Sequence, residues 1–194
     1  MAISEEAKAY FESGKVLLQR GESGLLLDEA IDKFRKALIS APNYPDLHFY
    51  LGIAYFRKGA LNKAVEQFHQ VIELSGDYQS THLQYAHLQL GIIYIKQKSW
   101  EQARLSLEKV LEMNPSSAEA YFNLGEVYFK MSKQGLADLE QALKMYKKAV
   151  SLNPDYPEAH VGLGQVYREK KMFSEAGDEF RKADELEEYQ RGIR

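Results

Sequence analysis

The chain has 194 residues, 45% of them hydrophobic, which is enough for a domain with a buried core and argues against a disordered chain. Its 25 basic and 28 acidic residues give a net charge of -3 without a basic block, which argues against nucleic acid as a partner. Because cysteine is absent, disulfides, thiolate zinc sites and a cysteine nucleophile are excluded.

The N-terminal segment, MAISEEAKAYFESGK, carries acidic residues where a secretory signal would have a basic region followed by an apolar core. No stretch approaches the roughly eighteen apolar residues of a membrane-spanning helix, so we expect no membrane insertion. We expect a cytoplasmic protein. A signal or anchor trimmed from the N-terminus of a longer parent protein stays an alternative.

A glycine recurs inside segments that have a helical pattern of apolar residues. The five positions are Gly14, Gly52, Gly91, Gly125 and Gly164, at spacings of 38, 39, 34 and 39 residues. Three residues after each glycine, one helical turn further on, stand Leu17, Tyr55, Tyr94, Tyr128 and Tyr167. A glycine inside a helix costs about 1 kcal/mol relative to alanine, so its periodic use indicates close packing against another helix.

A second helical segment follows each glycine segment, and in it a small, a large and a small or medium residue recur at i, i+4 and i+7. The five sets are Ala30, Phe34 and Ala37; Ala64, Phe68 and Val71; Ala103, Leu107 and Val110; Ala142, Tyr146 and Ala149; and Ala176, Phe180 and Ala183. Helix stops follow the first four sets at Pro42, Gly76, Pro115 and Pro154. The chain therefore reads as five pairs of helices.

These residues resemble the tetratricopeptide repeat (TPR), in which Gly, Tyr, Ala, Phe, Ala and Pro recur over about 34 residues as helix A, a turn and an antiparallel helix B. The resemblance covers nearly the whole chain. It implies an all-α fold, a right-handed α-α superhelix (TPR solenoid) of five antiparallel helix pairs. We expect a single TPR domain over residues 1–194, with repeats at about 7–44, 45–78, 84–117, 118–156 and 157–190.

The sequence departs from the repeat in four segments. Repeats one and four have four and five extra residues between their helices, in QRGESGLLLDEA and KMSKQGLADLEQA, which predicts longer turns or longer helices. The five-residue insertion 79–83, QSTHL, predicts an additional turn at the start of the third helix A. The last unit ends in DELEEYQRGIR, which predicts a polar C-terminal helical extension that caps the stack.

The resemblance places function on the concave face, which an outward stripe of the helices A lines. In repeats two to four this stripe is apolar, with Phe49, Tyr50, Ile53, Phe56, Tyr85, Leu88, Ile92, Ile95, Phe122 and Phe129. We predict a groove that binds an apolar peptide or an amphipathic helix of a partner protein through apolar anchors. The alternative is that these residues pack across helix A against the next repeat.

Charged residues border the stripe. The acids Asp46, Glu119 and Glu158 stand near the start of a helix A, and the bases Arg57, Lys96 and Lys130 stand near its end. The helix dipole is one explanation, because it favours acids at the N-terminus and bases at the C-terminus. The other is that they form an acidic and a basic rim that orients a ligand in the groove.

The TPR resemblance also raises a chaperone-tail receptor, in which Lys, Asn and Arg of successive helices A hold a C-terminal carboxylate. At those places the sequence has Phe11, Lys15, Tyr50, Tyr85 and Gln89, and only Asn123 matches an asparagine of the set. We therefore do not expect a chaperone C-terminal carboxylate as the ligand.

The sequence offers no catalytic, metal or cofactor site. His48, His87 and His160 share one repeat position, and equivalent positions lie on the order of 10 Å apart. A zinc ion needs nitrogen ligands at about 2 Å, so we expect these histidines to be packing residues. The expected function is that of a non-catalytic scaffold or adaptor without a cofactor. The alternative is a self-associating structural TPR protein that forms homo-oligomers or larger assemblies.

Overall fold

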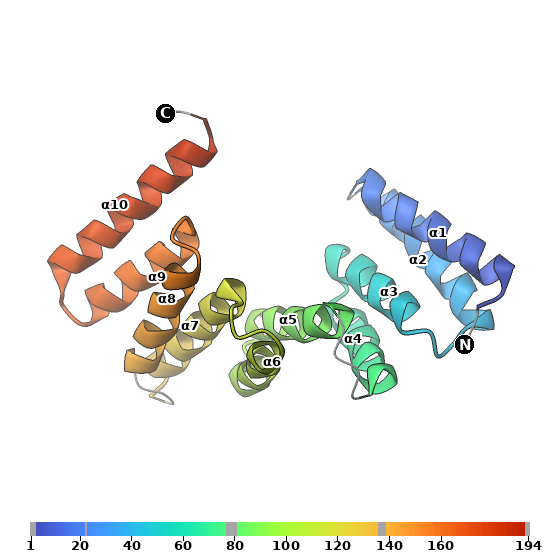
Figure 1. The fold of residues 1–194 in the computed structure, drawn as a ribbon, viewed down its shortest axis with the longest axis horizontal. Coiled ribbons are helices and arrows are strands. Elements are labelled where there is room, and N and C mark those ends of the chain that lie inside the picture. Colours follow the sequence, from blue (N-terminus) through green and yellow to red (C-terminus); the bar gives the residue numbers. More distant parts are fainter. Residues whose placement is uncertain (1–2, 22, 77–80, 136–138, 193–194) are drawn as a thin grey trace. The chain divides into compact units, whose positions relative to one another are not determined.

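The computed structural model describes residues 3–21, 23–76, 81–135 and 139–192. In these ranges every regular element is an α-helix, and there are ten (Figure 1). They are α1 (Glu5–Arg20), α2 (Gly24–Ser40), α3 (Pro45–Arg57), α4 (Leu61–Ser75), α5 (Thr81–Lys96), α6 (Trp100–Met113), α7 (Ala118–Lys133), α8 (Leu139–Leu152), α9 (Pro157–Glu169) and α10 (Phe173–Gln190). None of these ten helices combines the length and the apolar character needed to cross a membrane.

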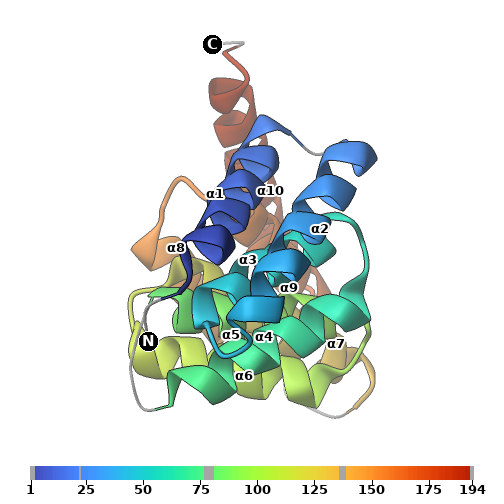
Figure 2. The ribbon, with the colours of Figure 1, turned by 90° about the vertical axis from the view of Figure 1, so that its right-hand side faces the viewer.

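Contacts divide the chain into two compact units, Met1–Ile93 and Tyr94–Arg194, and the division falls inside α5. In the first unit α1 packs on α2, α3 packs on α4, and α2 packs on α3. The helices α1 and α2 lie side by side in both Figure 1 and Figure 2. In the second unit α7 packs on α8, α9 packs on α10, and α8 packs on α9. The single domain over residues 1–194 stays a prediction.

Side chains and prolines fix where several helices begin. Ser4, Ser23 and Ser117 are N-caps, and the Oγ of Ser4 accepts a hydrogen bond from the Ala7 backbone N–H at 3.2 Å. Pro45 and Pro157 occupy the first position of α3 and α9, where a missing N–H costs nothing. The Tyr-Pro pairs of the sequence therefore mark two equivalent helix starts.

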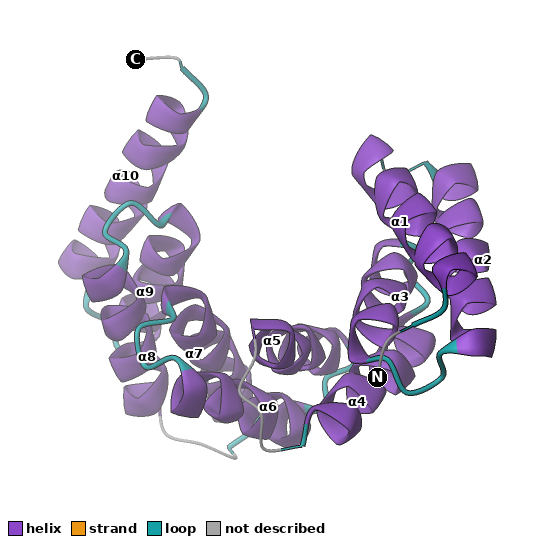
Figure 3. Ribbon diagram, turned by 45° about the vertical axis from the view of Figure 1, so that its right-hand side comes forward, coloured by secondary structure: helices purple, strands orange, loops and turns teal. Residues whose placement is uncertain are grey.

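Within the described residues short loops join successive helices (Figure 3), and three of the turns from helix A to helix B share one hydrogen bond. The N–H groups of Ala60, Ser99 and Met172 donate to the carbonyls of Tyr55, Tyr94 and Tyr167, each at 2.9 Å. Just before each donor stands a residue with positive φ: Gly59 at 78°, Lys98 at 58° and Lys171 at 61°. The periodic tyrosines thus also supply the carbonyls that close helix A.

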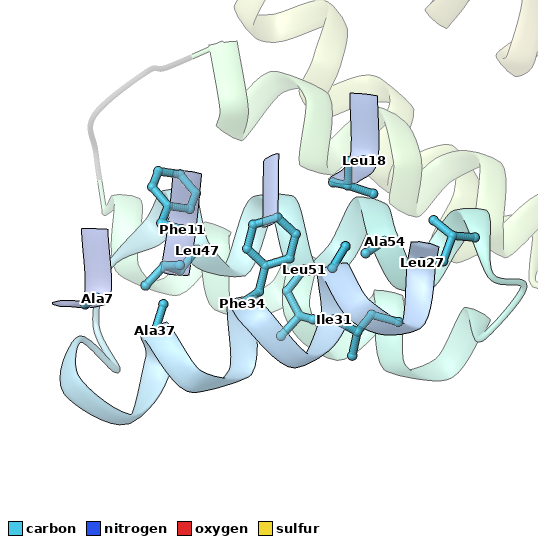
Figure 4. Packing of buried hydrophobic residues seen from close by; sticks show 11 residues of the cluster. Ala7, Phe11, Leu18, Leu27, Ile31, Phe34, Ala37, Leu47, Leu51 and Ala54 are labelled. Carbon is cyan, nitrogen blue, oxygen red and sulfur yellow. The ribbon is translucent and has the colours of Figure 1, made fainter. Parts of the chain in front are cut away.

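The repeated glycines allow the close helix packing that the sequence predicts. A Cβ placed on Gly14 would lie 2.6 Å from the Phe34 ring, and one on Gly52 would lie 2.8 Å from the Phe68 ring. Gly164 approaches Phe180 in the same way. Phe34 is fully buried in a cluster that includes residues of α1 and α3 (Figure 4). The prediction is confirmed at these pairs, because any larger side chain would push helix A away from helix B.

The departures from the repeat lie at helix ends. Residues 81–83 of the insertion form the first turn of α5, as predicted, while residues 79–80 lie outside the described residues. The extra residues of repeat one lie at the end of α1 and the start of α2, except residue 22, which lies outside the described residues. Of the extra residues of repeat four, 136–138 also lie outside the described residues. The polar C-terminal extension is helical through Gln190.

Candidate functional site

The ten residues predicted to line an apolar groove differ in how far they reach the surface. Phe49, Leu88 and Phe129 are only 7%, 8% and 8% exposed, so they belong mainly to the core. Tyr85 is 37% exposed. The remaining six are half-buried: Tyr50, Ile53, Phe56, Ile92, Ile95 and Phe122. The apolar surface on offer is smaller than the pattern suggests, and the groove stays a prediction.

Part of the predicted apolar surface is covered by the next repeat, as Phe49 illustrates. Its ring stacks on the imidazole of His82 in α5, with centroids 4.0 Å apart and planes 20° apart, and meets Tyr85 edge-on at 5.3 Å. Nδ1 of His82 also lies 2.9 Å from Oδ1 of Asp46. Phe49 therefore packs across helix A onto the next repeat, which is the alternative that the sequence left open.

The predicted rim charges are exposed except for Asp46, which is half-buried. Asp46 has His82 as its partner, and Nη1 of Arg57 donates to the Leu18 carbonyl at 3.1 Å. These two charges thus have structural contacts inside the first unit. Lys96, Lys130, Glu119 and Glu158 are exposed, and a role for the set in orienting a ligand stays a prediction.

We call the packing of α1, α2 and α3 the first junction. Here the Tyr50 ring stacks over Phe34, with centroids 6.1 Å apart and planes 26° apart, and meets the Phe11 ring at 5.4 Å. Nζ of Lys15 lies 5.1 Å from the Phe11 centroid and 5.7 Å from that of Tyr50, within cation–π range. The first junction is therefore filled by the chain's own side chains.

The second junction, formed by α7, α8 and α9, has a pocket of about 260 Å³ instead. Phe122 and Phe129 from the predicted groove and Lys130 and Glu158 from the predicted rim all line it. The structure thus brings together four residues that the sequence singled out. The lining is completed by Glu126, Tyr146, Val161, Gly162 and Gln165, which sequence reasoning missed.

Tyr146 is a deeply buried residue of the pocket lining. It is only 3% exposed and lies against a glycine on each of two helices. A Cβ on Gly162 would lie 2.5 Å from the Tyr146 ring, and one on Gly125 would lie 2.6 Å from it. The Phe122 ring packs on Tyr146 with centroids 5.9 Å apart. Burial raises the pKa of Tyr146 well above its usual range, and the nearby Glu126 carboxylate raises it further. The phenol is therefore neutral at physiological pH.

The charges of the lining are predominantly acidic, with Glu126 and Glu158 against Lys130. Neither carboxylate forms an ion pair with another residue in the described part of the chain. Beside the pocket, Nζ of Lys133 lies 5.6 Å from the Phe129 centroid and pairs with Glu169. The pocket thus presents aromatic side chains and two carboxylates that have no ion-pair partner among the described residues.

A signal for this pocket exists in the sequence. Gly162 is the first glycine of VGLGQV, and it stands two residues before the repeated glycine, where the other repeats carry Glu12, Tyr50, Gln89 and Asn123. A missing side chain at one repeat position indicates a hollow. The contribution of Tyr146 could not be read in this way, because its sequence pattern indicates only a core residue of helix B.

Comparison with known families decides what kind of protein this is. A profile described as "TPR repeat" matches residues 14–59, 91–132 and 137–171, and two described as "Tetratricopeptide repeat" match residues 45–78 and 157–190. The chain belongs to the tetratricopeptide repeat family. The predicted family and the all-α solenoid fold are thereby confirmed. TPR proteins are protein–protein interaction scaffolds, so this part of the prediction holds as well.

Solved TPR structures resemble the chain over almost its full length. A structure of MamA from Desulfovibrio magneticus RS-1 is 28% identical with a TM-score of 0.83, and covers 97% of this chain and 99% of its own. Another MamA structure is also 28% identical, with a TM-score of 0.79 and coverage of 97% and 95%. YrrB, described as a TPR protein with an unusual peptide-binding site, is 21% identical with a TM-score of 0.72 and coverage of 94% and 87%, and shows the fold alone. No curated protein sequence matches the chain.

The TPR fold also accounts for two of the periodic histidines. Nε2 of His48 lies 2.7 Å from the Pro42 carbonyl oxygen and its Nδ1 lies 2.9 Å from Oε1 of Gln67 in α4. His160, 1% exposed, makes the same two kinds of contact, with the Pro154 carbonyl at 2.9 Å and Glu179 in α10 at 2.6 Å. The predicted packing role is confirmed for both. Within the described ranges no three potential metal ligands gather.

Proposed function

We propose that this TPR protein is a non-catalytic scaffold or adaptor that binds an apolar peptide or amphipathic helix of a partner along its helices A. The observation that carries the proposal is the pocket of the second junction, which lies between helices A and which α7 lines with Phe122 and Phe129 from the predicted stripe. Pockets with aromatic walls and a few polar groups are the usual form of a binding site. The proposal assigns no catalytic residue and no cofactor.

In the first unit the proposal rests on apolar side chains of α3 and α5 that still reach the surface. Tyr85 is the most exposed of them, and Ile53 and Ile92 are half-buried. Leu88 and Phe49 would support these residues from the core and would not themselves touch a ligand. Because an extended peptide or an amphipathic helix uses apolar anchors at intervals, a few exposed positions suffice.

The test uses defined peptides. Peptides selected from a random library on the unmodified protein are titrated calorimetrically into the double variant Ile53→Glu with Ile92→Glu. We expect at least tenfold weaker binding with unchanged helical circular dichroism. The matched control is Ile39→Glu, because Ile39 lies on α2, a helix B, and is 82% exposed.

Two results would overturn this proposal. One is a folded double variant that binds the selected peptides as tightly as the unmodified protein. The other is an Ile39→Glu control that loses binding to the same extent, because the peptides would then bind the helix B face.

Self-association is the second candidate, because large apolar side chains are exposed on helices B. Ile39, Leu105 and Phe173 are 82%, 51% and 70% exposed. Sedimentation velocity over a hundredfold concentration range tests it. A sedimentation coefficient that rises with concentration and falls back in Phe173→Glu supports assembly, and a monomer at every concentration counts against it.

A further inference from the structure

Each junction contains a pair of packed aromatic rings, which we call its floor, and the two junctions differ in the groups that cover this floor. Phe11 and Phe34 of the first junction correspond, repeat for repeat, to Phe122 and Tyr146 of the second. In each junction the two rings pack together, with centroids 6.1 Å apart in the first and 5.9 Å apart in the second. The same kind of aromatic surface is thus built twice.

The first junction covers this surface with a flat ring and a cation. Tyr50 supplies the ring, stacked over Phe34, and Lys15 supplies the ammonium group over the rings of Phe11 and Tyr50. The ring and the cation lie next to each other, so the chain itself shows which groups this surface accepts.

The second junction lacks both groups. Gly162 stands at the position of Tyr50, and Glu126 stands at the position of Lys15. The missing side chain leaves the pocket of about 260 Å³, and the exchange of lysine for glutamate makes its lining acidic. With Glu158 the lining has two carboxylates that no cation of the described residues pairs with.

We propose that this pocket binds the side chain of an arginine from the partner segment. A guanidinium group is flat and cationic, so it replaces in one group the ring of Tyr50 and the charge of Lys15. Its plane stacks on Phe122 or Phe129, and its N–H groups donate to the carboxylates of Glu126 and Glu158. The inference rests on the proposed function, since it places one residue of the peptide that α7 and α9 would bind.

Other side chains fit the pocket less well. An apolar or aromatic side chain would remove water from the carboxylates of Glu126 and Glu158 without giving them a partner, which costs free energy, so the apolar anchors of the proposed peptide would lie outside this pocket. An acidic side chain would be repelled by them. A lysine supplies the charge but not the planar group that matches the missing ring, so it should bind more weakly than arginine.

The experiment is an NMR titration of the full chain with acetyl-Gly-Arg-Gly-amide, followed through the backbone amides of Val161 and Gly162. We expect saturable shifts with a dissociation constant on the order of millimolar, as befits one side chain. The lysine peptide should bind at least threefold more weakly. The citrulline peptide, which has nearly the same shape without the charge, should produce no saturable shift at the same concentrations.

Two protein variants test the carboxylates. The double variant Glu126→Gln with Glu158→Gln should bind the arginine peptide at least fivefold more weakly, and Glu126→Lys, which restores the cation of the first junction, should abolish binding. The matched control is Glu185→Gln, an exposed glutamate of α10 that is not part of the pocket and should leave binding unchanged. The amide spectrum itself reports whether each variant is folded.

The inference is wrong if citrulline binds as tightly as arginine, if the double variant binds normally, or if no saturable shift occurs with the arginine peptide. These outcomes are separable from a failure of the proposed function. If library-selected peptides still lose affinity in the variant of Ile53 and Ile92, peptide binding stands and only the arginine pocket falls.

Discussion

Similar sequences contribute α3 to the first junction and α9 to the second, NYPDLHFYLGIAYF at 43–56 and DYPEAHVGLGQVYR at 155–168. Yet side chains fill the first junction, and the second has a pocket. Their Tyr-Pro helix starts and their histidine contacts are the same. They differ at two positions above the floor: Gly162 takes the place of Tyr50, and Glu126 takes the place of Lys15. A repeat scaffold can therefore keep its packing frame while such exchanges leave a pocket and change the charge of its lining.

The comparison also separates the residues that the two junctions share from those in which they differ. The aromatic neighbours of the floor are retained, with Tyr44 meeting Phe11 at 6.1 Å and Tyr156 meeting Phe122 at 5.1 Å. The groups above the floor change in both size and charge. Features that the junctions share thus serve the fold, and the features that differ are where a ligand would be recognised.

The largest expected effect comes from removing the floor itself. Phe34→Ala and Tyr146→Ala should each lower the free energy of unfolding by about 3–5 kcal/mol, because both side chains are almost fully buried. Urea denaturation followed by circular dichroism measures the loss. Leu25→Ala, at a residue that is 72% exposed, should change stability by less than about 0.5 kcal/mol. A loss below about 1 kcal/mol at either aromatic would show that its junction does not depend on it.

A smaller effect is expected from crowding the open junction. Gly162→Ala should lower the free energy of unfolding by about 1–3 kcal/mol, because its Cβ would lie 2.5 Å from the Tyr146 ring. Gly177→Ala is the control, since a Cβ there meets nothing within 4 Å and α10 should gain up to about 1 kcal/mol. If both alanines stabilise the protein, then Gly162 is not required for close packing.

The junctions should also differ in their response to alkaline pH, because only the second has a buried phenol. Burial and Glu126 raise the pKa of Tyr146 above its unfolded value of about 10. The stability that this shift contributes is complete below that value and is lost as the pH rises toward the folded pKa. Tyr146→Phe should therefore lose less stability than the unmodified protein between about pH 9 and 11 in thermal unfolding scans. Equal losses of stability in the two proteins would show that the phenol of Tyr146 does not cause the loss at alkaline pH.

The smallest expected effect concerns the turns. Gly59 and Lys171 occupy equivalent turns with φ of 78° and 61°, and the left-handed conformation is costly for lysine. Lys171→Gly should raise the free energy of unfolding by about 1 kcal/mol, and Gly59→Lys should lower it by a similar amount. Thermal melts of the two variants measure both changes. Shifts of the same sign would show that side-chain contacts, not backbone conformation, govern these turns.

The sequence predicts the helix pairs well because their determinants are local and periodic. Gly14 and Phe34, or Gly164 and Phe180, stand at matching places in their repeats, and the structure brings each pair into contact. Burial along the stripe is harder to predict, because it depends on the next repeat. Phe49 is covered by His82, a residue of the insertion that interrupts the repeat period.

The pocket lies between these cases. Its groove residue Phe122 and its rim residue Glu158 follow from their repeat positions. Tyr146 could not be assigned to the pocket from the sequence, because a residue at this place on helix B is predicted only to lie in the core. Its contact with the pocket depends on two glycines from different helices. The sequence thus indicates which helices line a site, while the contents of the site depend on contacts between repeats.

His48 and His160 have a mechanical consequence. Each links the loop before its own helix to the second helix of the same repeat, through Pro42 and Gln67 or through Pro154 and Glu179. Tension applied at that loop would load both helices of the repeat together. Under a stretching force we expect each of these two repeats to unfold as one unit, whereas a helix pair without such a histidine link would unfold one helix at a time.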